Sequence, residues 1–185
     1  DQIGDGSTIN ITQTGNSNAV GNATNKATFN GGNNTVTVEQ IGNSNIANLN
    51  VQGAGNTISS QVTGDSNAIE ISCGAGGGSC SGSTITNTIT GDGNAVTQNS
   101  DGTTTSTVTI NSDNNTVNIN NTSTAAAGAK SAVDISGGGG NSVAITQAGA
   151  AGTNGHDASV TIVGATNTVD VKQGGSVDSK VVSTI

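Results

Sequence analysis

The sequence lacks proline, methionine, tryptophan, tyrosine and arginine, and it has a single phenylalanine, Phe29, and a single leucine, Leu49. A domain of 185 residues normally buries leucine and aromatic side chains in its core. Their near absence excludes an ordinary globular enzyme core. The sequence also contains no Gly-x-Ser-x-Gly, Ser-x-x-Lys, His-Glu-x-x-His or P-loop motif. We therefore expect no enzymatic activity and no cofactor.

Charged residues are equally scarce, at 9% of the chain, and the net charge is −8 with four lysines. This balance disfavours binding to nucleic acid or to anionic lipid. No apolar run is long enough to cross a bilayer, and no signal-like segment begins at Asp1. We expect the mature form of a secreted protein that does not insert into a membrane.

The residues that are abundant favour an all-β protein. The chain has 29 Gly, 26 Asn and 28 Thr, which are poor helix formers. Valine and isoleucine recur at alternate positions, the period of a strand with one buried face. Between these runs the motif Gly-x-x-Asn repeats with steps of about 11 residues, as from Gly31 to Gly42, Gly53 and Gly64.

The repeat predicts a strand of about seven residues followed by a four-residue turn. We expect one domain over residues 1–185, a two-strand-per-turn β-solenoid of about eight coils stacked into a filament. About sixteen strands, alternating between two sheets, should begin near residues 7, 18, 26, 34, 45, 56, 67, 83, 94, 105, 115, 131, 141, 158, 167 and 177. Insertions at 73–82, 99–104, 122–130 and 148–157 should all lie on one edge, where solenoids accommodate them.

The alternation also predicts which side chains point inward. The expected apolar interior comprises Ile9, Ile11, Val36, Val38, Leu49, Ile69, Ile71, Ile89, Val117, Ile119, Val143, Ile145, Ile162, Val169 and Val171. Buried amides need hydrogen-bond partners, and stacking of identical amides along the axis supplies them. The expected amide ladder comprises Gln13, Gln40, Gln147, Gln173, Asn18, Asn34, Asn45, Asn56, Asn67, Asn94, Asn115, Asn141 and Asn167. The expected turn glycines, which tolerate positive φ, are Gly15, Gly31, Gly42, Gly53, Gly64, Gly91, Gly138 and Gly164.

Two cysteines, Cys73 and Cys80, flank a glycine-rich hexapeptide. Two thiols cannot complete a structural zinc site, and a short-range disulfide is the better interpretation. A disulfide implies an oxidising, extracytoplasmic compartment. The lone histidine, His156, is interpreted as a solvated loop residue, so we expect no metal site. Asp92-Gly-Asn94 and Asp113-Asn-Asn115 are explained best as turn-forming residues.

Several stretches resemble a known family. Ser7…Gln13-Thr14-Gly15…Asn18 and Gln40-Ile41-Gly42…Asn45-Ile46-Ala47 look like the curlin repeat, Ser-x5-Gln-x-Gly-x2-Asn-x-Ala-x3-Gln. That family forms curli, the secreted amyloid fibres of bacterial biofilm matrix. The resemblance implies a cell-surface filament built from copies of this chain, with roles in biofilm and adhesion. It also implies a dedicated outer-membrane secretion and nucleation system as a partner.

Two other functions are compatible with the sequence. Outward threonine pairs such as Thr35/Thr37, Thr84/Thr86 and Thr107/Thr109 suggest an ice-binding β-solenoid, although Thr57/Ser59 and Ala132/Asp134 interrupt the array. The stretch from Asn16 to Gly21 suggests a trimeric adhesin head. The filament is favoured because both ends read as plain strands, and uncapped strand edges pair with further chains.

Overall fold

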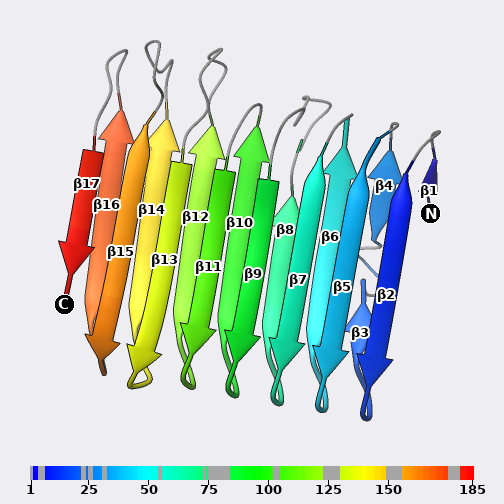
Figure 1. The fold of residues 1–185 in the computed structure, drawn as a ribbon, viewed down its shortest axis with the longest axis horizontal. Helices are drawn as coiled ribbons and strands as arrows, with labels where there is room; N and C mark the ends of the chain where they lie inside the picture. Colours follow the sequence, from blue (N-terminus) through cyan, green and yellow to red (C-terminus); the bar gives the residue numbers. More distant parts are fainter. Residues whose placement is uncertain are drawn as a thin grey trace.

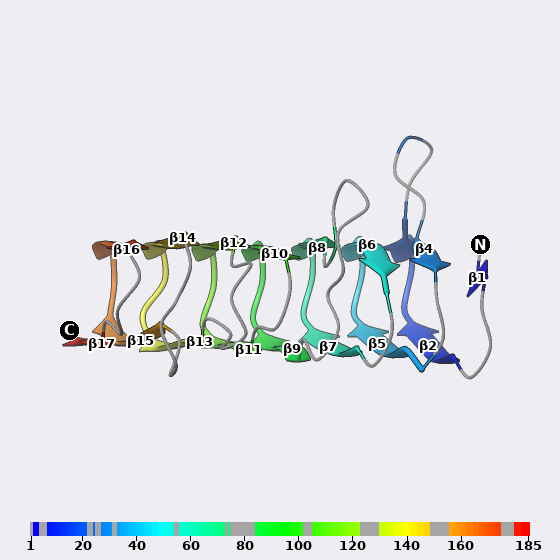
Figure 2. The same cartoon turned by 90° about the horizontal axis from the view of Figure 1, so that it is seen from above.

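Alternating apolar residues produce parallel strands in two facing sheets. In the computed structural model, residues 2–3, 7–21, 24, 27–30, 33–53, 56–72, 74, 84–101, 105–122, 130–148, 156–174 and 180–185 are described, and no helix occurs among them. Figure 1 shows the strands side by side along the long axis, and Figure 2 shows the two layers edge on. The protein is an all-β parallel solenoid with two sheets.

Each sheet takes every other strand of the chain. In the described residues, sheet A runs in the order β1 (Gln2–Ile3), β4 (Thr28–Asn30), β6 (Ile46–Gln52), β8 (Ala68–Ser72), β10 (Ala95–Asp101), β12 (Thr116–Thr122), β14 (Ser142–Ala148) and β16 (Thr168–Gly174), with β3 (Ala19–Val20) also pairing β6. Sheet B runs in the order β2 (Thr8–Thr14), β5 (Thr35–Ile41), β7 (Thr57–Thr63), β9 (Thr84–Thr90), β11 (Thr105–Asn111), β13 (Lys130–Gly137), β15 (Asp157–Gly164) and β17 (Lys180–Thr184).

The two long edges of the solenoid differ. The links from sheet B to sheet A contain the Gly-x-x-Asn turns, and we call this side the turn edge; it lies at the bottom of Figure 1. The links from sheet A back to sheet B lie on the opposite side, which we call the joint edge. The four predicted insertions lie largely outside the described residues, and their placement on one edge stays a prediction; the described strands β8, β10, β12 and β14 near which they begin all belong to sheet A.

The prediction of about eight equivalent coils is wrong. In the described residues, five coils each contain one strand from each sheet, and both strands have seven or eight residues. These coils are β5–β6, β9–β10, β11–β12, β13–β14 and β15–β16. In the coil formed by β7 and β8, the strand β8 has only five residues. The predicted strands near residues 18 and 26 do not belong to different sheets. They form β3 and β4, which pair with the start and the end of the same strand, β6.

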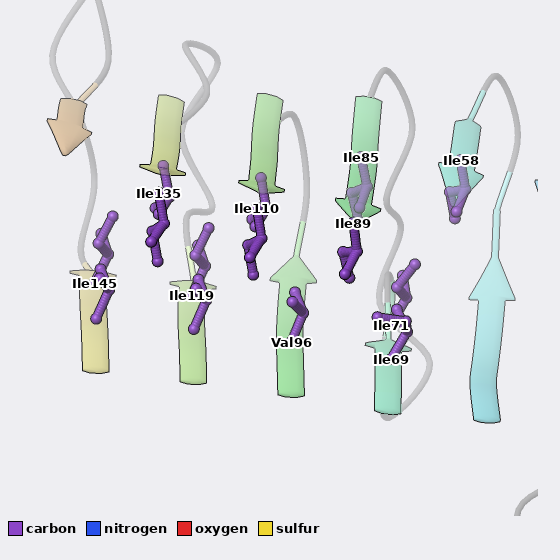
Figure 3. Packing of buried hydrophobic residues seen from close by; sticks show 14 of the residues in the cluster. Ile58, Ile69, Ile71, Ile85, Ile89, Val96, Ile110, Ile119, Ile135 and Ile145 are labelled. Atoms are coloured by element: carbon purple, nitrogen blue, oxygen red, sulfur yellow. The ribbon is translucent and has the colours of Figure 1, made fainter. Parts of the chain in front are cut away.

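The interior between the sheets is a stack of valine and isoleucine. Figure 3 shows Ile58, Ile85, Ile89, Ile110 and Ile135 of sheet B facing the side chains of sheet A. Of the expected apolar interior, thirteen residues are at most 8% exposed. The exceptions are Ile9, which is half-buried, and Ile11, which is 44% exposed because β2 is the outermost described strand of sheet B.

Candidate functional site

The turn edge has one conformation repeated in successive rungs. Each four-residue turn places its third residue at a φ near +60°, where a short polar residue or glycine is tolerated. These residues are Ser17, Ser44, Ser66, Gly93, Asn114, Gly140 and Thr166, with φ between 58° and 75°. Backbone hydrogen bonds join neighbouring turns, such as the 2.9 Å bond from Ser66 N–H to Asn43 O. The turns therefore stack in register with the strands.

A continuous ladder of asparagine amides lies just inside this edge. Asn67 Nδ2 donates to Asn45 Oδ1 at 3.0 Å, and Asn67 Oδ1 accepts from Asn94 Nδ2 at 3.1 Å. The same oxygen accepts the backbone N–H of Asn94 at 2.9 Å, and Asn67 Nδ2 also reaches Gly91 O at 2.8 Å. The pattern of amide-to-amide bonds links Asn18, Asn45, Asn67, Asn94, Asn115, Asn141 and Asn167.

The other predicted amides lie in shorter groups. Asn34 and Asn56 bond to each other at 2.9 Å on the joint edge, apart from the seven-residue ladder. Gln13 donates to Gln40 at 2.7 Å in sheet B, whereas Gln147 donates to Gln173 at 2.6 Å in sheet A. The four glutamines thus form two pairs, one in the first strands of sheet B and one in the last strands of sheet A.

The predicted turn glycines fall into different environments. Gly15, Gly42, Gly64 and Gly91 stack on the turn edge with φ between 111° and 134°, and Gly53, on the joint edge, has a φ of 96°. Gly138 and Gly164 lie on the turn edge. Gly31 lies outside the described residues.

A second ladder, on the outer side of the turns, was not predicted from the sequence. Each acceptor is an Asn or Asp side chain that receives a backbone N–H from the neighbouring turn. Asp65 Oδ1 accepts from Asn43 at 2.6 Å, and Asp92 Oδ1 accepts from Asp65 at 2.7 Å. The sequence contains a pattern that indicates this ladder: in five successive turns the second residue is Asn or Asp. These residues are Asn16, Asn43, Asp65, Asp92 and Asp113.

His156 is not a solvated loop residue, so that prediction is wrong. Its side chain is fully buried, and neither ring nitrogen has a hydrogen-bond partner among the described residues. His156 directly precedes β15 and lies two residues before Ala158. Its side chain therefore points inward, as those of Ala158 and Val160 do. Its carbonyl accepts the backbone N–H of Lys130 at 2.8 Å, which holds the segment in the stack.

A polar pocket of about 240 Å³ lies beside the gap between β3 and β4. Its lining includes Thr28, Asn48, Asn50, Glu70 and Ser72. Glu70 is the one ionisable side chain among the described residues that line this pocket. In the part of the chain that the structure describes, no group of three or more His, Cys, Asp or Glu residues is placed to hold a metal ion.

Cys73 and Cys80 lie outside the described residues, and the disulfide stays a prediction. Mass spectrometry without reductant should find a mass lower by two hydrogens than that of the dithiol. Replacing both residues by serine should lower the free energy of unfolding by about 2.5 kcal/mol, because the bridge closes a short loop. Two thiols that react fully with an alkylating reagent before reduction would overturn the disulfide.

The two ends of the solenoid present strands with one side uncovered. In sheet B, no described strand pairs with the outer side of β2 or of β17. Ile11 and Ile185 at these ends are 44% and 48% exposed, although the residues at equivalent positions in the inner strands are buried or nearly so. Val182, on the outward face of β17, is 63% exposed.

The fold and its ladders define a parallel two-sheet β-solenoid with stacked amides. Comparison of the chain with protein-family models, curated proteins and solved structures gives no match. Among the described residues no helix is long and apolar enough to cross a membrane.

Proposed function

We propose that the protein is a structural subunit that stacks head to tail into an extracellular, curli-like filament. The observation that carries the proposal is the pair of uncovered strands, β2 at one end of sheet B and β17 at the other. A single coil cannot bury enough apolar surface to fold alone, so each rung of a solenoid is stabilised by its neighbours. An uncovered rung gains the same stabilisation by pairing with another copy.

The register of the chain specifies how two copies would meet. Ile9 and Val181 occupy the same position in their strands, since both align with Val36, Ile58, Ile85, Ser106, Ser131 and Ala158 through successive pairs. Continuation of sheet B therefore places β17 of one copy against β2 of the next, with Val182 opposite Asn10. In sheet A, β16 would meet β1, so both sheets continue across the same junction.

The backbone groups at the junction are complementary. Thr8 N–H bonds to Asn34 O within the chain, so the N–H groups of Ile9, Ile11 and Gln13 point to the uncovered side of β2. Ile185 N–H bonds to Thr161 O, so the N–H of Val182 points to the uncovered side of β17. In a filament Val182 would donate to Ile9 O and accept from Ile11 N–H.

Proline at these positions tests the proposal. In Ile11→Pro and Val182→Pro the lost N–H faces a side on which no described strand pairs, and proline is tolerated in edge strands. Each variant should keep the β-rich circular dichroism spectrum. Filament growth from it should slow at least about tenfold, because the missing bond and the ring's steric conflict cost more than about 1.4 kcal/mol.

The matched controls are Ile11→Thr and Val182→Thr, which keep the backbone N–H and should elongate at nearly the rate of the parent chain. Negative-stain microscopy and thioflavin kinetics supply the readout. Normal elongation of both proline variants would mean that the filament does not grow through β2 and β17.

A second candidate function, ice binding, is favoured by one observation. The outward residues Thr35, Thr57, Thr84 and Thr105 stand in register on four adjacent strands, and Thr37, Ser59, Thr86 and Thr107 form a parallel row. Within each row the hydroxyl groups repeat about every 4.8 Å, the distance between adjacent strands, and the two rows make a regular surface. Stable monomers that show thermal hysteresis would support this function in place of the filament.

A further inference from the structure

Three polar side chains interrupt the apolar interior at its centre. Ser60 of β7 and Asn87 of β9 are neighbours in sheet B, and Gln98 belongs to β10 of sheet A. Their exposed fractions are 0%, 0% and 1%. Asn87 lies four residues before Gly91 and Gln98 four residues after Asn94, so the two amides face each other across one coil. Ser106 and Asn121, placed symmetrically about the next turn, bond across the core at 2.8 Å.

The polar atoms of these three side chains find no partner among the residues that the structure describes. This holds for Ser60 Oγ and for both amide atoms of Asn87 and of Gln98. Buried polar groups in stable proteins are almost always hydrogen-bonded. The three residues therefore require a partner that the described part of the chain does not supply.

Ser60 has a smaller side chain than the residues at the equivalent positions of β5 and β11. The equivalent positions in β5 and β11 hold Val38 and Val108, and serine has one heavy atom fewer than valine. The missing methyl group is comparable in size to one water molecule. The set also combines amide donors with amide and hydroxyl acceptors. Water satisfies both kinds of group, whereas a metal cation would leave the amide N–H groups unpaired.

We propose that Ser60, Asn87 and Gln98 form an internal binding site for ordered water between the two sheets. The water bridges the hydroxyl of Ser60 to the facing amides and completes their hydrogen bonds. The site is separate from the asparagine ladder, whose members bond to one another, and it does not depend on filament formation.

The sign of one stability change tests this site. In Ser60→Val the added methyl groups displace the water and leave both amides unpaired, so the midpoint of thermal unfolding should fall by roughly 3 °C or more. A dry site would respond in the opposite direction, because valine would remove an unpaired hydroxyl and fill the space. A midpoint that rises or does not change overturns the proposal.

Two further measurements keep the test independent of how well the variant folds. The control Ser106→Val removes a hydroxyl that already has a protein partner, Asn121, and should lower the midpoint whether or not Ser60 binds water. An experimental structure of the unmodified chain should show solvent density within about 3.2 Å of Ser60 Oγ and of the amide of Asn87 or Gln98. Absence of that density at a resolution that shows other buried waters overturns the site.

Discussion

Replacing Gly64 by alanine should lower the free energy of unfolding by about 4 kcal/mol or more, enough to unfold the solenoid or to prevent its formation. Gly64 has a φ of 131°, a conformation that L-residues rarely adopt. A Cβ at this position would lie 2.7 Å from the carbonyl carbon of Gly91 and closer still to its oxygen. That backbone cannot move away, because the Gly91 carbonyl accepts the Asn67 amide at 2.8 Å. Denaturant unfolding followed by circular dichroism measures the loss.

The control is Gly93→Ser, two residues beyond Gly91 in the next turn. Gly93 has a φ of 66°, and three other turns hold serine at the equivalent position with φ of 59° to 60°. Its Cβ would approach the side-chain oxygen of Asn114, which can rotate away. The expected change is less than about 1 kcal/mol. Equal effects of the two variants would contradict the argument that stacked carbonyls, and not turn flexibility, require glycine at Gly64.

Replacing Asn67 by alanine should cost about 3–5 kcal/mol. Its amide makes four hydrogen bonds, to Asn45, Gly91 and both the backbone and side chain of Asn94. The substitution removes these bonds and leaves buried groups on two neighbouring rungs without partners, which is the expensive outcome for a buried polar network. The midpoint of denaturant unfolding should fall accordingly.

Asn118→Ala is the matched control, since Asn118 is exposed on the outer face of β12. Its effect should stay within about 0.5 kcal/mol. If Asn67→Ala and Asn118→Ala have similar effects, the ladder is not a main source of stability.

The strands could be predicted from the sequence because their pattern is strictly local. Alternating residues such as Val36/Val38 and Val143/Ile145 show which face is buried before any tertiary contact is considered. The pairing of β3 and β4 with one strand is not local. Residues 18–30 contain two short apolar segments, which form β3 and β4. The residue pattern does not indicate that both segments belong to the same sheet. For this reason the prediction assigned these two segments to different sheets.

For the candidate site residues, too, local patterns could be predicted from the sequence and non-local contacts could not. The repeated Gly-x-x-Asn turn predicts which asparagines share an edge, yet the spacing does not reveal that Gln13 and Gln147 end strands of different sheets. His156 was misinterpreted because it lies in a long link, where an exposed side chain is the usual outcome. Whether the amides of Asn87 and Gln98 form hydrogen bonds depends on which side chains face each other across the coil. Inward alternation indicates their burial but not their hydrogen bonds.

The contrast between the two edges has a consequence for engineering. The turn edge repeats a four-residue turn that ends in asparagine, whereas the links on the joint edge range from three residues (102–104) to eleven (73–83). Guest peptides placed in these links would leave the asparagine ladder untouched. Because successive rungs are about 4.8 Å apart, such guests would stand along a single line at multiples of that distance. The choice of link would thus set the distance between displayed groups.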